Sequence, residues 1–170
     1  PFIKQIVKMT GWVVRGKEET EEEGFHLQYI GEKSVYSPTT AVFDAIREME
    51  RMGHMAISNL ERAMNALVTL DEQEIEQVYQ VERQIDYLNH EITSYLVKVN
   101  GTTLPADDAK SIGGLFHVVN DIERIGDHAE NIADAAVARL KQNIGFSESA
   151  KRELSSMLDM VIKITTYALD

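Results

Sequence analysis

The sequence contains no cysteine, few basic residues and no long apolar run, and each shortage excludes a class of protein. Without cysteine the chain has neither a disulfide framework nor a thiolate metal site. Lysine and arginine number 17 against 28 acids, for a formal net charge of −11. This balance argues against nucleic acid as a partner, because nucleic-acid binding relies on lysine and arginine to neutralise phosphates. No apolar run reaches the roughly 18 residues that a membrane-spanning helix needs.

Motifs for a catalytic nucleophile are missing as well. The sequence has no G-x-S-x-G turn and no glycine-rich loop that could cradle a phosphate. A di-iron carboxylate enzyme would need Glu-x-x-His pairs on its helices. That spacing occurs only at Glu23 and His26, inside a glycine-bearing segment. The sequence therefore offers no catalytic residue and predicts a protein that is not an enzyme.

The first 37 residues differ in composition from the rest. Residues 1–16 form an amphipathic stretch with three basic residues and no acid, which suits a membrane interface or a terminal helix that docks on the domain. Residues 17–37 are an acidic linker with a run of glutamates, of the kind that is usually solvated. The chain begins without methionine and ends inside an apolar pattern, so we expect it to be part of a longer protein.

The remaining residues have the spacing of long amphipathic helices. Apolar residues recur every three or four positions over about residues 38–70, 72–99, 105–142 and 147–170, and no stretch alternates long enough to be a buried strand. The stripe expected to be buried in the third segment is Leu115, Val118, Ile122, Ile125, Ala129, Ile132 and Ala136. Short loops between the segments predict an all-α fold, an antiparallel three-helix bundle with a fourth helix.

Polar pairs four residues apart lie beside three of the apolar stripes: Glu50 and His54, Glu82 and Asp86, and Glu123 and Asp127. Side chains at i and i+4 lie one turn apart on a shared face. Carboxylates in this position can share a divalent cation, and histidine adds affinity for zinc or iron. Asn131, or Glu130 beside it, continues the last polar stripe. The alternative is a solvated or structural role, because a chain with 28 acids has many such pairs by chance.

Residues 121–132, with the sequence DIERIGDHAENI, resemble the signature helix of PhoU-like phosphate-uptake regulators. Residues 78–88, with the sequence VYQVERQIDYL, are similar to the preceding helix of that family. The resemblance covers roughly residues 38–140, and its third helix is the most specific part. Residues 1–37, together with the SPTTA start of the first helix, resemble the stretch that joins the membrane part of a bacterial sodium/phosphate cotransporter to its C-terminal PhoU-like domain.

The resemblance implies a PhoU-like three-helix repeat over residues 38–146 and the first helix of a truncated second repeat over residues 147–170. It implies a regulatory domain of a sodium-dependent phosphate transporter at the cytoplasmic face of the cell membrane, with the membrane portion of that transporter as its partner. E/D-x-x-x-D pairs of the family can hold metal clusters. The resemblance therefore implies a divalent metal ion, such as iron or zinc, bound by four residues of this chain, and it fits three other residues less well. The four are Glu82, Asp86, Glu123 and Asp127, and the weaker three are Glu50, His54 and Asn131.

Two other functions stay open at this point. One is a carboxylate-bridged metalloenzyme on a helical bundle, and the other is a purely structural dimerisation bundle. The apolar face of the fourth segment continues to the end of the chain, so we expect a homo-oligomer or a swapped helix. Phosphate binding by this domain is not supported, because the basic residues are scattered and no glycine nest is present.

Overall fold

The computed structural model of the protein describes residues 25–31, 38–102 and 106–169. Its regular elements are the helices α2 (Pro38–Thr69), α3 (Glu72–Asn100), α4 (Ala106–Gln142) and α5 (Glu148–Leu169). No strand occurs in these residues, so the expected all-α fold is confirmed. The amphipathic stretch 1–16 lies outside the described residues, as does the linker 17–37 apart from residues 25–31. None of the described helices is long and apolar enough to cross a membrane.

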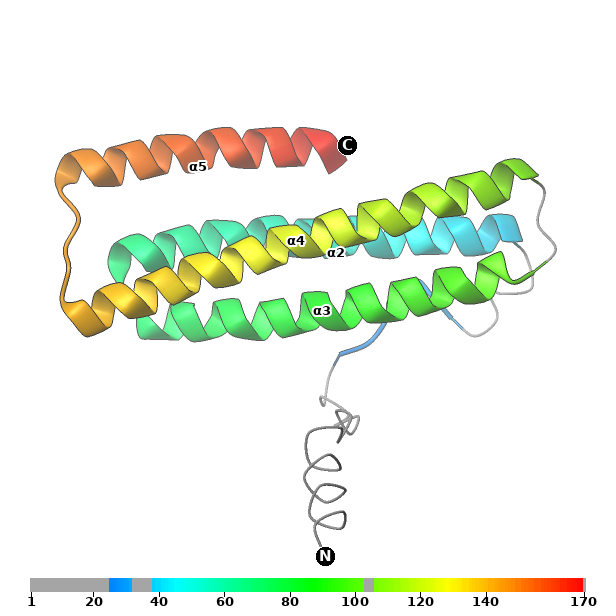
Figure 1. Ribbon diagram of the computed structural model, residues 1–170, viewed down its shortest axis with the longest axis horizontal. Coiled ribbons are helices and arrows are strands. Elements are labelled where there is room, and N and C mark those ends of the chain that lie inside the picture. Colours follow the sequence, from blue (N-terminus) through cyan, green and yellow to red (C-terminus); the bar gives the residue numbers. More distant parts are fainter. Residues whose placement is uncertain (1–24, 32–37, 103–105, 170) are drawn as a thin grey trace, which may run out of the picture.

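Helices α2, α3 and α4 pack on one another as an antiparallel bundle (Figure 1). Two groups of buried side chains fill it along its length. One group includes Met52, Ile85 and Leu88, and the other lies nearer the α2–α3 turn and includes Leu67 and Val78. Each fully buried large aliphatic side chain contributes about 1.5–3 kcal/mol relative to exposure. The bundle is therefore held together mainly by these apolar seams.

The buried positions of α4 follow a seven-residue repeat. Two series run along the helix: Ile112, Val119, Gly126 and Ala133, and beside them Ile122, Ala129 and Ala136. The expected stripe is wrong at one position, because Val118 is 44% exposed whereas its neighbour Val119 is buried. A spacing near 3.5 residues per turn keeps a seam facing its partner helix over many turns. The buried stripe therefore has the expected spacing but is rotated about the axis of α4, because the series of Val119 is buried in place of the series of Val118.

Helix α3 has the same repeat, with one charged residue inside it. One series consists of Val78, Ile85, Ile92 and Val99. The second series consists of Ile75, Glu82, Asn89 and Leu96. Ile75 and Leu96 are buried as expected for seam positions, and so is Glu82, at 6% exposure. A carboxylate thus occupies a position where the pattern of the helix calls for an apolar side chain.

Helix ends are fixed by specific polar contacts. Asp71 caps α3, because its Oδ1 accepts hydrogen bonds from the backbone N–H groups of Gln73 at 2.8 Å and Glu74 at 3.3 Å. Arg139 is buried near the end of α4. It donates to the carbonyl of Leu67 in α2 and to the carbonyl of Ile144 at 2.9 and 3.1 Å. Its guanidinium also lies 3.5 Å from the centre of the Phe146 ring. These contacts tie the α4–α5 link to the last turn of α2.

Helix α5 packs chiefly on α2 and leaves a second apolar side uncovered. Leu154, Leu158 and Ile162 pack against the buried group near the α2–α3 turn. At the other end Leu169 lies over Gly53, where an added Cβ would come within 2.8 Å of its methyl groups. The expected single face is therefore divided. The large apolar side chains of α5 that stay exposed are Met157, Met160, Val161, Ile164 and Tyr167, with exposures from 38 to 83%.

Candidate metal centre

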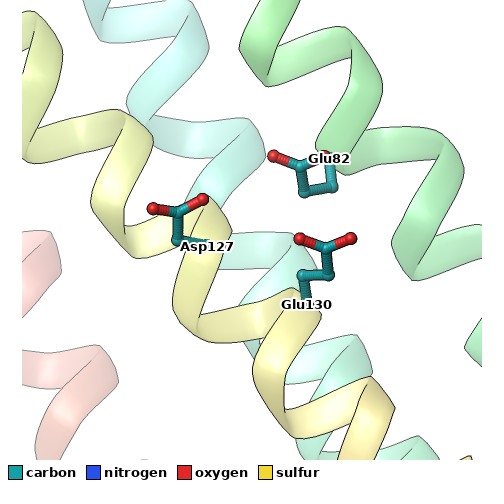
Figure 2. A group of neighbouring side chains, drawn as sticks. All are labelled: Glu82, Asp127 and Glu130. Carbon is teal, nitrogen blue, oxygen red and sulfur yellow. The ribbon is translucent and has the colours of Figure 1, made fainter. Parts of the chain in front are cut away.

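Three carboxylates from two helices meet in the seam between α3 and α4. Each of Glu82, Asp127 and Glu130 offers one oxygen, and these oxygens all lie within 4.8 Å of one another. Figure 2 shows Glu82 on α3, facing Asp127 and Glu130, which come from successive turns of α4. Glu82 is buried, whereas Asp127 and Glu130 are half-buried. We call these three residues the carboxylate group.

A close contact one turn away positions the carboxylate group. Gly126 is buried in α4, and a Cβ added there would lie 3.2 Å from Cγ2 of Ile85. The absence of a side chain lets α3 and α4 approach at this point. Ile85 follows Glu82 by three residues and Asp127 follows Gly126 directly, so the same contact places both carboxylates in the seam.

Further acids surround the carboxylate group: Asp86 on α3, and Glu123 and Asp134 on α4. The only hydrogen bond to any of these acids' side chains within the described residues comes from Tyr79, whose hydroxyl donates to Asp134 at 2.7 Å. In the same residues no lysine, arginine or histidine forms an ion pair with any of the six acids; Arg124 instead lies 3.9 Å from exposed Asp121. The seam therefore has a concentrated negative charge, which Arg124 partly offsets at Glu123 without forming an ion pair there.

Burial and this crowding of charge shift the protonation of the seam. Burial, followed by repulsion from Asp86, Glu130, Asp127 and Glu123, raises the pKa of Glu82 from 4.5 to about 7. Burial and then neighbouring acids also raise the pKa of Glu123 and Glu130. The charged form of Glu82 is thus disfavoured near neutral pH unless a cation compensates it.

The structure brings some of the predicted metal residues together and separates others. Glu82 and Asp127 belong to the carboxylate group. Their expected partners lie at its edge, since Asp86 is exposed and Glu123 half-buried. Asn131 is exposed, and its amide donates to the backbone carbonyl of Asp127 at 2.8 Å. Its place in the group is taken by the neighbouring Glu130.

Glu50 and His54 are not part of the carboxylate group. Both are exposed on α2, where they line a separate pocket of about 290 Å³ with Tyr29, Arg47 and Arg51. The pairing rule of four residues favoured them because it cannot tell which side of α2 faces the other helices. Glu130 follows Asp127 by three residues, and side chains at i and i+3 also lie on a shared face of a helix, so a search for this spacing would have found it.

The donor set has a definite chemistry. Three carboxylates and no thiolate or imidazole suit hard or borderline divalent cations. Glu82 is 6% exposed, and within the described residues its carboxylate has neither a hydrogen bond nor an ion pair to another side chain; a bound cation would compensate its charge. The residues present therefore fit a cation held between α3 and α4.

Comparison with known proteins places this bundle in a family. Residues 32–136 match the PhoU domain. The chain belongs to the PhoU domain family. The matched residues include the whole of α2 and α3 and most of α4, with all three members of the carboxylate group. The resemblance in residues 121–132 is thus confirmed at the level of the family.

The PhoU relatives are named phosphate-specific transport system accessory protein PhoU homologues. The one from Clostridium acetobutylicum is 34% identical over 90 residues, which are 52% of this chain and 41% of the relative. The Aquifex aeolicus protein is 28% identical over 112 residues, covering 61% of this chain and 51% of the relative. The Pseudomonas aeruginosa protein is 29% identical over 120 residues, covering 70% and 49%. The chain thus spans about half the length of these relatives, and no solved structure matches it.

The raised pKa of Glu82 predicts a pH dependence of stability. The unfolded chain releases this proton near pH 4.5, whereas the folded protein holds it up to about pH 7. The free energy of unfolding of the chelator-treated protein should therefore fall by roughly 1–3 kcal/mol between pH 5 and pH 8. Urea titrations at several pH values measure it. Glu82→Gln should flatten this dependence and Asp121→Asn, an exposed acid on α4, should not; an equally steep dependence in both variants would contradict the assignment.

Proposed function

We propose that this chain is a non-catalytic regulatory domain for phosphate transport. The observation that carries the proposal is the PhoU match over residues 32–136, which coincides with the α2–α4 bundle. The relatives that share this part of the chain are named as accessory proteins of phosphate-specific transport systems. The described helices provide a packed bundle with a charged seam.

The transporter that we propose as its partner is sodium-dependent, and the domain would lie at the cytoplasmic face of the membrane. Support comes from the sequence, where the basic amphipathic stretch 1–16 and the SPTTA start resemble the junction in sodium/phosphate cotransporters. A membrane portion that contacts the domain would also bring residues 1–16 to the lipid interface, which suits their lysines and tryptophan.

Phosphate uptake by cells that carry the gene tests this function. Leu88 is fully buried, so Leu88→Asp should unfold the bundle, whereas Val97→Asp changes a residue of α3 that is 58% exposed. Uptake of labelled phosphate in sodium medium should change at least twofold with Leu88→Asp and stay unchanged with Val97→Asp. Uptake in potassium medium should be unaffected by either. Equal sodium-dependent uptake in all strains would refute the proposal, and a change confined to potassium medium would refute the sodium-dependent partner.

We also propose that the carboxylate group binds a divalent cation, such as an iron or zinc ion. The support is the buried, unpaired Glu82 and the two carboxylates that face it from α4. The bound ion would neutralise repulsion across the seam and so draw α3 and α4 together. No observation favours a metalloenzyme, because no histidine joins the group within the described residues.

Metal titration of the chelator-treated chain tests this site. At a cation concentration about 100 times the dissociation constant, binding should stabilise the fold by roughly 2.7 kcal/mol and raise its thermal midpoint. Manganese, magnesium, zinc and anaerobic ferrous iron are the probes. Glu82→Gln and Asp127→Asn should abolish the rise, while Asp121→Asn should keep it. A rise that survives in the seam variants would place the ion elsewhere, and no rise with any metal would exclude the site.

The uncovered side of α5 supports self-association of this chain. Ile164 is 69% and Tyr167 is 83% exposed, and they share a side with Met157 and Met160. Apolar surface of this kind associates with another apolar surface. Sedimentation velocity should show a dimer or larger species that Ile164→Glu converts to monomer. Ser155→Glu, a change at an exposed polar position of α5, should leave the association intact; a monomeric native chain would count against the proposal.

A further inference from the structure

A short segment without helix, residues 25–31, lies on the bundle ahead of α2, and we call it the strap. It appears in blue in Figure 1, beside α3. Residues 25, 27, 29 and 30 are half-buried, residues 26, 28 and 31 are exposed, and the backbone bends at residues 28 and 29. The strap connects residues 1–24 to the bundle.

Glu48 of α2 holds the backbone of the strap. Its side chain is completely buried. One carboxylate oxygen accepts the backbone N–H groups of Gln28 and Tyr29, both at 2.8 Å. The other accepts the Nε of Arg51 at 2.6 Å. Arg51 also donates to the backbone carbonyl of His26 at 3.3 Å, so this pair of side chains binds three successive peptide units.

Side chains of the strap reach two helices. Leu27 and Ile30 pack against the buried group around Met52 and Ile85. The Tyr29 ring lies 4.1 Å below the guanidinium of Arg47 on α2, and the Phe25 ring lies 5.9 Å from the ring of Tyr87 on α3. The strap therefore joins α2 and α3, with its backbone held by Glu48 and with Leu27 and Ile30 against the core.

The way in which Glu48 is paired makes release of the strap feasible. Arg51 belongs to the same helix and forms an ion pair with Glu48 that does not involve the strap. When the strap leaves, the carboxylate keeps its cation, and water replaces the two backbone donors. An isolated carboxylate would be costly at that place, but this one is never left alone. Helices α2, α3 and α4 retain their own apolar seams throughout.

We propose that the strap docks and undocks as a unit while the bundle stays folded, with Glu48 as the residue that holds it. Residues 1–24 are joined directly to this segment in the sequence. A partner or surface that binds residues 1–24 thus changes the balance between the docked and undocked strap, and with it the exposure of the apolar side chains beneath Leu27 and Ile30. The switch acts at α2 and α3 and needs no cation in the carboxylate group.

Hydrogen exchange of the full chain in chelator tests the proposal. The amides of Gln28 and Tyr29 should exchange more slowly than in an unfolded peptide but faster than those of Leu88 and Ile92 in α3. Glu48→Gln should accelerate the strap amides about tenfold, because the charge-assisted hydrogen bonds weaken. The α3 amides should not change. Glu61→Gln, at an exposed acid farther along α2, should leave both sets as they are.

A second pair of variants leaves α2 untouched, so the test survives if Glu48→Gln fails to fold. Gln28→Pro removes one of the two N–H donors, and Gln28→Ala keeps it. Gln28→Pro should accelerate exchange of the Tyr29 amide, and Gln28→Ala should not. The proposal is overturned if the strap amides exchange only together with α3, if they exchange as in an unfolded peptide, or if Gln28→Pro leaves them unchanged.

Discussion

The close approach of α3 and α4 at Gly126 is the constraint on which the rest of the structure depends. With no side chain at this position, Ile85 fits against the backbone of α4. The same approach brings the carboxylate of Glu82 next to Asp127 and Glu130. The tightest contact between α3 and α4 therefore lies next to the carboxylate group. What stabilises the bundle as an apolar seam also forces three acids together, and the raised pKa of Glu82 reports the cost.

The bundle accepts this cost because the surrounding positions are apolar and well packed. Val78 and Ile85, on either side of Glu82 in α3, are fully buried. The side-chain amide of Asn59 in α2 donates to the backbone carbonyl of Val78 at 3.0 Å, which fixes how α2 and α3 lie against each other. A replacement of Glu82 by leucine would suit the repeat better. Retaining an acid there at the expense of stability is typical of a residue with a function.

Much of the fold could be predicted from the sequence, because long periodic segments specify helices and short loops specify antiparallel neighbours. The end of α4 at Gln142 and that of α3 beside Gly101 agree with the expected ends to within a residue. The PhoU resemblance also holds. The position of Val119 was missed, because Val118 and Val119 are both apolar and the spacing alone does not show which of the two faces the other helices. Glu82 was expected beside the stripe rather than within it, since an acid gives no apolar signal. Which acids meet across two helices depends on their relative rotation, which no single-helix spacing contains; the metal role itself stays a prediction.

Helix α5 is supported along one side, by Leu154, Leu158 and Ile162 through its middle and by Leu169 at its end. At its start, the Arg139 contacts tie the preceding link to the last turn of α2, and near its finish Leu169 lies over Gly53. Gly53 is only five residues from Glu48, so one of those supports stands next to the place where the N-terminal segment is held. The strap and the last turn of α5 therefore both contact the same short part of α2, although they are more than a hundred residues apart in the sequence.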